Sequence, residues 1–374
     1  MSVRSTVVAV VVGAVTVFAV SASAAADQGH SATQEAMDEQ VAKGAAPGVL
    51  AQAEDGGGVW KGASGTAERT TLRPPLAGDR FRIGSLTKPF VAAVVLQLAA
   101  EGKVGLDDPV ERWLPGTLKG HGHDGRRVTV RQLLGHTSGV YDFTADPAVR
   151  RDYFGPGFLR SRYEAREPAA QVRTAMRHAP SFAPGAGWEY SNTNYVLVGM
   201  VVERVTGRSY AEEVERRITR PLGLDDTSLP GGSPRIAGPH GRSYSTLSRS
   251  GPHAPVYDVT GLDPSLAGAA GEMISSTDDL IRFMRALLGG DVLPPRQLRE
   301  MKSAVPTGDG SRYGLGLTVR RLSCGTEVWG HEGTIQGSRS TAVTTADGAH
   351  SAAFNINGDW SDGTDALLEA EYCG

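Results

Sequence analysis

The 374-residue chain has little cysteine and no excess of charge of either sign. Its 38 basic and 41 acidic residues leave a net charge of −3, which excludes a broad cationic surface for nucleic acid. The hydrophobic content of 40% is that of an ordinary globular protein, so wholesale disorder is excluded too. At about 150 residues per domain, the length allows two or three domains, or two halves that share one core.

Long apolar runs are absent after residue 26, so no later segment is expected to span a membrane. Before that point, Arg4 precedes an apolar run from Thr6 to Val20, and small residues follow as far as Ala26. This pattern is typical of a secretory signal peptide, with a retained membrane anchor as the alternative. We therefore expect residues 1–26 to be removed. The mature chain is then expected to be secreted and monomeric, with no nucleic-acid or membrane partner.

Only two cysteines are present, Cys324 and Cys373, and both lie in the part expected to be exported. An even count in an oxidising compartment favours a disulfide between them, with two free buried thiols as the alternative.

The hydrophobic pattern changes from strands to helices and back to strands. A hairpin is expected around Gly56–Gly58, and a short strand at 81–83 leads into an apolar helix over 86–100. Residues 106–263 are rich in Arg, Pro and helix-like segments. Further strands are expected at 313–322, 327–330, 340–345 and 349–356. The order predicts an α/β (α+β) fold in which residues 27–105 and 264–374 form a sheet domain and 106–263 a mainly helical subdomain.

Ser85 and Lys88 lie three residues apart at the start of the apolar helix. One helical turn brings their side chains to the same face. A serine hydroxyl becomes a good nucleophile when a neighbouring base takes its proton, and lysine is such a base once burial lowers its pKa. A helix start also directs a backbone N–H toward a developing oxyanion. Alone, this spacing is common by chance.

Two further motifs carry possible chemistry. Tyr190-Ser191-Asn192 combines a phenol that can move protons with an amide that can bind a substrate amide. His331-Glu332-Gly333-Thr334 follows a short strand, and its glycine would let a substrate backbone lie alongside. Each could also be an ordinary polar loop.

In this order the three motifs resemble the signature of the serine β-lactamase and penicillin-binding-protein family: Ser-x-x-Lys, Tyr-x-Asn and Lys/His-x-Gly. Their intervals resemble the class C β-lactamase and DD-peptidase branch, closest to the secreted actinomycete D-alanyl-D-alanine carboxypeptidases. Further matching stretches are Leu133–Gly139, Pro221–Leu224, Ala267–Leu280, Tyr313–Leu317 and Leu322–Cys324. The resemblance covers nearly the whole mature chain and implies an antiparallel sheet flanked by helices, with an all-helical subdomain.

The resemblance also implies roles for individual residues. Ser85 would form an acyl-enzyme, and Lys88 and Tyr190 would move its proton as a coupled pair, with the base left open. His331 would lie beside Tyr190 and, when protonated, lower the pKa of its neighbours. The remaining implied roles are substrate binding by Asn192, Gly333 and Thr334, and an oxyanion hole from the backbone N–H groups of Ser85 and Thr334. No metal or organic cofactor is implied.

The sequence departs from the carboxypeptidases where they bind the substrate's terminal carboxylate. Glu332 replaces a threonine, and Thr318 stands at the position of an arginine. An anionic side chain facing an anionic substrate end weakens binding. Arg320 lies two residues from Thr318 on the same strand face, where it could pair with Glu332 or bind the carboxylate itself.

Our first hypothesis is therefore an acyl-enzyme hydrolase that acts as a D-Ala-D-Ala carboxypeptidase on peptidoglycan-type peptides. An esterase or D-amino-acid peptidase or amidase of the same family is second, and a β-lactamase third. The alternative of another class is a non-catalytic penicillin- or peptidoglycan-binding module, which the intact Ser85, Lys88 and Tyr190 disfavour. The absence of Gly-x-Ser-x-Gly disfavours an α/β-hydrolase. His121-Gly122-His123-Asp124 lacks the spacing of a zinc site.

Overall fold

The computed structural model describes residues 29–251, 253–361 and 363–374. The predicted signal peptide, residues 1–26, therefore lies outside the described residues.

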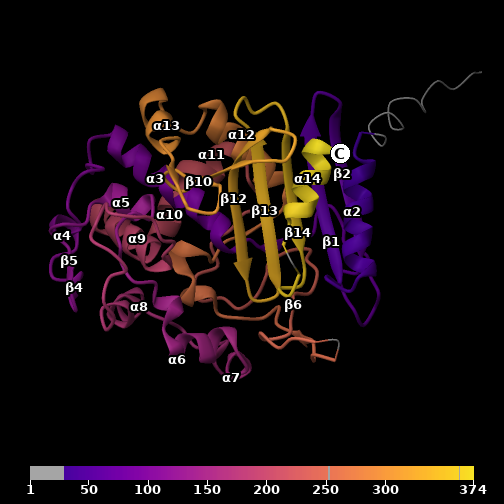
Figure 1. Ribbon diagram of the computed structural model, residues 1–374, viewed down its shortest axis with the longest axis horizontal. Coiled ribbons are helices and arrows are strands. Elements are labelled where there is room, and N and C mark those ends of the chain that lie inside the picture. Colours follow the sequence, from indigo (N-terminus) through magenta and orange to yellow (C-terminus); the bar gives the residue numbers. More distant parts are fainter. Residues whose placement is uncertain (1–28, 252, 362) are drawn as a thin grey trace, which may run out of the picture.

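Both ends of the chain contribute to one sheet. Within the described residues, this sheet has eight antiparallel strands in the order β2-β1-β14-β13-β12-β11-β10-β9. Strand β1, from the start of the chain, pairs directly with β14, from its end. Figure 1 shows the indigo N-terminal strands beside the yellow C-terminal ones. The strands are β1 (Gly48–Asp55), β2 (Gly58–Gly65), β9 (Val305–Pro306), β10 (Arg312–Tyr313), β11 (Thr318–Arg321), β12 (Glu327–Ile335), β13 (Ser338–Thr345) and β14 (Ser351–Ile356). The short ladders are β3 (Phe81–Arg82) with β8 (Ile274–Ser275), β4 (Lys119–Gly120) with β5 (His123–Asp124), and β6 (Tyr244–Ser245) with β7 (Tyr257–Asp258).

Helices cover both faces of the sheet, and a further group lies to its side. One face packs against α12, the other against α2 and α14, and the magenta helices gather beyond β12 (Figure 1). The helices are α2 (Ser31–Ala42), α3 (Thr87–Ala100), α4 (Val110–Trp113), α5 (Val130–Leu134), α6 (Pro147–Val149), α7 (Phe158–Ser161), α8 (Pro168–Ala175), α9 (Asn192–Thr206), α10 (Tyr210–Val214), α11 (Arg220–Leu222), α12 (Thr277–Gly289), α13 (Pro295–Met301) and α14 (Asp365–Cys373). This mixed architecture confirms the predicted fold class.

Side chains of the central strands alternate between two cores. In β14, Ala352, Phe354 and Ile356 pack toward α2 and α14, whereas Ala353 packs toward α12 and the larger core around α3. Because both faces are buried, the strand reads as a nearly continuous run of small and apolar residues.

Two strand predictions were wrong in their bounds. The strand expected over 313–322 is divided into β10 and β11 because residues 314–317 leave the sheet, and Gly316 there has a φ of +84°. The strand expected over 327–330 continues to Ile335, since its residues stay paired with β13 throughout. The histidine motif therefore lies inside a strand and not after it.

The predicted disulfide is present, and it joins Cys324, in the loop between β11 and β12, to Cys373 at the end of α14. It ties the end of α14 to the loop that leads into β12, the strand that carries the histidine motif. No helix in the described ranges is both long and apolar enough to cross a bilayer.

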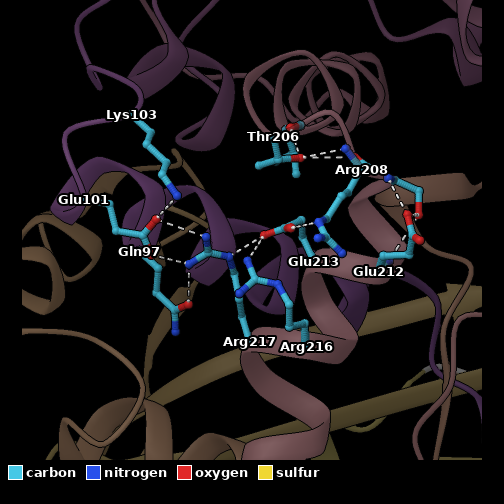
Figure 2. A network of polar contacts seen from close by, with 11 residues as sticks. Gln97, Glu101, Lys103, Thr206, Arg208, Glu212, Glu213, Arg216 and Arg217 are labelled. Carbon is cyan, nitrogen blue, oxygen red and sulfur yellow. Dashed lines mark hydrogen bonds and ion pairs between the residues drawn. The ribbon is translucent and has the colours of Figure 1, made fainter.

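A buried ion-pair network fastens the end of α3 to the helical region (Figure 2). Glu213 of α10, whose side chain is 1% exposed, accepts hydrogen bonds from Arg216 and Arg217 of the following segment η4 (Glu215–Thr219). Arg217 Nη2 also donates to Glu101 Oε2 at 3.1 Å, directly after α3 ends. The helix that begins near Ser85 is thus held at its other end by charged side chains.

We expect Glu213→Gln to lower the free energy of unfolding by about 3 kcal/mol, because it leaves the buried Arg217 without one of its two carboxylates. The matched control is Glu215→Gln, which removes an exposed pair with Arg220 and should cost under about 1 kcal/mol. Urea denaturation measures both variants. Equal losses of stability in the two variants would show that the buried ion pair contributes no more to the free energy of unfolding than the exposed one.

Candidate active site

Two glycines allow the turn that carries Ser85 to pack against β12. This turn is η1 (Gly84–Leu86), which precedes α3. Gly84 has a φ of +52°, and a side chain there would meet the Thr334 backbone at 2.8 Å. A side chain at Gly333 would meet the Ile83 carbonyl oxygen at 1.8 Å. The close approach places the backbone of Ser85 beside that of Thr334, where an oxyanion hole was expected.

Lys88 is buried, and its ammonium group has three acceptors. Nζ lies 2.9 Å from Ser85 Oγ, 2.9 Å from Asn192 Oδ1 and 2.7 Å from the Ala270 carbonyl oxygen. Burial lowers the pKa of Lys88 to about 7, although the charge of Asp142 opposes this shift. Near neutral pH, a large fraction of Lys88 is therefore uncharged and able to take the proton of Ser85.

Asn192 joins Lys88 to a carboxylate that the sequence did not reveal. Its Nδ2 donates to Asp142 Oδ2 at 3.2 Å and to Thr144 Oγ1 at 3.3 Å, while its Oδ1 accepts from Lys88. Burial raises the pKa of Asp142, and hydrogen bonds from Thr144 oppose the shift. The amide predicted to orient the substrate is thus engaged on both sides with the protein, and it also lines the cavity at Ser85.

Tyr190 completes the group around Ser85. Desolvation raises the pKa of its phenol, against a hydrogen bond with Ser85, and Lys88 Nζ lies 4.8 Å from the centre of its ring. The phenol therefore keeps its proton under conditions in which Lys88 loses one. Of the two candidate bases left open by the sequence, these opposite pKa directions favour Lys88.

His331 lies beside Tyr190, with ring centres 6.3 Å apart. Burial and the nearby Lys88 lower the pKa of His331 to about 3. Its Nδ1 donates to the Glu332 carbonyl oxygen, so Nε2 accepts from the Tyr313 hydroxyl at 3.0 Å. The expectation that His331, when protonated, lowers the pKa of its neighbours therefore stays a prediction for acidic solution, because burial disfavours the charged imidazole near neutral pH.

Sequence reasoning missed the supporting residues Tyr313 and His136. The His136 ring lies 4.3 Å from the Tyr190 ring, and its Nδ1 accepts from Asn194 Nδ2 at 3.0 Å and from the Ser191 backbone N–H at 3.3 Å. Both residues fall in stretches that marked the family resemblance, which was the only available signal for them. They pack Tyr190 and His331 into fixed positions.

Glu332 forms an ion pair with Arg320, and Arg320 also pairs with Asp365 at the start of α14. Of the two alternatives for Arg320, the structure has the pairing with Glu332. Thr318, which stands where the carboxypeptidases are expected to have an arginine, lies opposite Gly330 on the neighbouring strand. Desolvation raises the pKa of Glu332, against the effect of Arg320.

A cavity of about 190 Å³ opens at Ser85. Asn192 and Thr334 line it near the nucleophile, and most of its remaining wall is apolar. The larger apolar side chains that line it are Phe143, Phe154, Phe158, Leu262, Leu266 and Ile335. Because ligand pockets for larger molecules measure roughly 300–1,000 Å³, this cavity suits a single bulky side chain.

The histidines of the 121–124 segment lie apart from this site, in and beside the β4–β5 hairpin. Asp124 is engaged by Arg126 at 2.9 Å. Across the described part of the chain, no three His, Cys, Asp or Glu side chains converge as a metal site would need.

Comparisons with known proteins agree with this geometry. The family model described as "Beta-lactamase" matches residues 33–372. Esterase EstB of Burkholderia gladioli is 32% identical over 350 residues, covering 86% of both chains. The solved D-stereospecific amidohydrolase from Streptomyces sp. is 52% identical, with a TM-score of 0.88 over 92% of this chain and 99% of that one. D-amino acid amidase from Ochrobactrum anthropi SV3 is 30% identical, with a TM-score of 0.78 over 92% and 98%.

Proposed function

This chain belongs to the Beta-lactamase family and is a serine hydrolase of that family, and on this premise we propose that it cleaves amide bonds of D-configured amino-acid amides and short peptides. The nucleophile is Ser85, and the acyl group of the substrate is transferred to it. Similarity to the amidohydrolase and the amidase supports both the amide bond and the D configuration.

The reaction follows from the contacts around Lys88. Uncharged Lys88 takes the Ser85 proton as Oγ attacks the carbonyl carbon, and the oxyanion faces the backbone N–H groups of Ser85 and Thr334. When the C–N bond breaks, the leaving amine takes a proton from Lys88 through the Tyr190 hydroxyl. A water molecule then attacks the ester in the same way, releasing the acid and restoring Ser85.

The ion pairs of Arg320 are the observation that favours an amino-acid amide over a D-Ala-D-Ala peptide as the substrate. Two carboxylates, from Glu332 and Asp365, already bind its guanidinium. A leaving group with a free carboxylate would meet the charge of Glu332 without an arginine of its own. An amide of ammonia has no such charge. D-Ala-D-Ala carboxypeptidase action, our first hypothesis from the sequence, stays a prediction.

We expect D-phenylalanine amide to be hydrolysed at least about tenfold faster, in kcat/KM, than its L isomer or a diacyl-Lys-D-Ala-D-Ala peptide. Glu332→Thr should raise peptide hydrolysis relative to amide hydrolysis, because it removes the repelling charge. Glu327→Gln is the control, since it removes an acid from the same strand that pairs with Arg312. A D-Ala-D-Ala peptide that outperforms the amide in the parent protein would refute the assignment.

Esterase action is the second candidate, favoured by the similarity to EstB over most of both chains. A p-nitrophenyl ester and nitrocefin in the same panel test it and the β-lactamase alternative. A fluorescent penicillin that binds without turnover of any substrate would instead indicate the non-catalytic module.

We further propose that the chain is exported and acts as a monomer on small peptides, amides or esters, including fragments of peptidoglycan. The Cys324–Cys373 disulfide supports export, because such bonds persist in oxidising compartments.

A further inference from the structure

A second and larger cavity adjoins the one at Ser85. This groove measures about 920 Å³, and four residues line both cavities: Phe154, Thr334, Ile335 and Gln336. Gln336 stands at the junction, where its Nε2 donates to the Tyr153 carbonyl oxygen at 2.7 Å. The groove is large enough for several residues of a substrate that is bound at Ser85.

The groove lies on the acyl side of the scissile bond. The leaving nitrogen must face Tyr190, which supplies its proton, and Tyr190 lies beside His331 and within the field of Glu332. Both cavities run in the other direction along β12, from Thr334 to Ile335 and Gln336. A chain in the groove is therefore an extension on the amino side of the residue that acylates Ser85.

The charges along the groove are mainly positive. Arg69 and Arg249 line it with exposed side chains, and in the described ranges neither guanidinium is paired with a carboxylate. Lys43 adds a third cation at the rim, paired with the exposed Glu39. Among the described lining residues the one acid is Asp359, whose Oδ2 accepts from the Gly337 backbone N–H at 2.9 Å.

Trp360 gives the groove an aromatic wall that is held in place. Its Nε1 donates to the carbonyl oxygen of Gly44, another lining residue, at 3.1 Å, and this bond fixes the orientation of the indole ring. The Arg69 guanidinium lies over the Tyr244 ring, 5.7 Å from its centre, and keeps no carboxylate partner there among the described residues. An aromatic wall beside guanidinium groups without a carboxylate partner suits a peptide backbone that carries carboxylate side chains.

We propose that this groove is a subsite for a carboxylate-bearing peptide extension on the amino side of the scissile D-residue. This inference rests on the proposed function. It makes the enzyme an amidase that releases ammonia from acidic peptides ending in a D-amino-acid amide, in addition to a hydrolase of simple amides.

The test compares acetyl-Glu-Glu-D-Phe-amide with acetyl-Gln-Gln-D-Phe-amide, which differ in charge and hardly in size. In the parent protein kcat/KM should be about tenfold higher for the Glu peptide at low salt, the size expected from two partly exposed ion pairs, and the ratio should shrink in 0.5 M NaCl. In the Arg69→Gln, Arg249→Gln double variant the ratio should fall to about one. The control is Arg173→Gln, an exposed arginine of α8 outside both cavities, which should keep the parent's ratio.

The proposal is overturned by a parent ratio near one, by a ratio that survives in the double variant, or by hydrolysis of D-phenylalanine amide with no turnover of either peptide. If no amide is hydrolysed, the proposed function fails. Calorimetric titration of the two peptides into Ser85→Ala then tests the groove separately from catalysis. Tighter binding of the Glu peptide would support the proposed subsite, and equal affinities would overturn it.

Discussion

Replacing Ser85 by alanine is expected to lower kcat by at least about 10⁴-fold on every substrate that the parent protein hydrolyses. The reason is local: Ser85 Oγ is the hydroxyl that lies 2.9 Å from the buried Lys88 amine, beside the backbone of Thr334. The fold should survive, since α3 keeps its buried apolar residues.

Neighbouring serines cannot substitute for Ser85. Ser138 donates its hydroxyl to Asn194 at 2.6 Å, and Ser191 Oγ is buried without a hydrogen-bond partner in the described structure. Ser303→Ala, at an exposed position after α13, is the matched control and should retain full activity. Mass spectrometry after a fluorophosphonate or penicillin probe should find the adduct on the peptide that contains Ser85. An adduct elsewhere, or a fully active Ser85→Ala, would remove the basis of the mechanism.

The positions of these residues could be predicted from the sequence, because spacing and helix geometry place Ser85 and Lys88 on one face. The pairing of Arg320 with Glu332 was likewise accessible, since alternate residues of a strand share a face. The charge state of His331 was not accessible. It depends on burial by Tyr313 and on the nearby Lys88, and both come from segments distant in sequence.

Asp142 illustrates the same limit. It is one of 41 acidic residues, and no local pattern distinguishes it. Only the fold brings it to Asn192, 50 residues away in sequence, and through Asn192 to Lys88, a further contact that spans 104 residues. The length of β12 was underestimated for a related reason: its pairing with β13 continues through a histidine motif that looked like a loop.

The pH dependence of kcat/KM should report on Lys88. Lys88 must be unprotonated to take the Ser85 proton, so activity should be low in acid and rise through an apparent pKa of about 7. Well below that pH, activity should fall about tenfold per unit. His331 should add no titration near neutrality, because burial lowers its pKa to about 3. Lys88→Arg should lower activity at least about 10³-fold at every accessible pH, since a guanidinium does not give up its proton.

Asp142→Asn tests whether Lys88, and not another group, is the base that takes the Ser85 proton. The Asp142 charge raises the pKa of Lys88, so its removal should move the midpoint of the profile to lower pH. Asp146→Asn is the control, because that carboxylate binds His178 at 2.9 Å and is not among the charges that shift Lys88. If another group were the base, for example Tyr190 with its raised pKa, the activity would rise only in strongly alkaline solution. A midpoint that stays fixed in Asp142→Asn, or moves equally in Asp146→Asn, would show that the proton of Ser85 goes to a group other than Lys88.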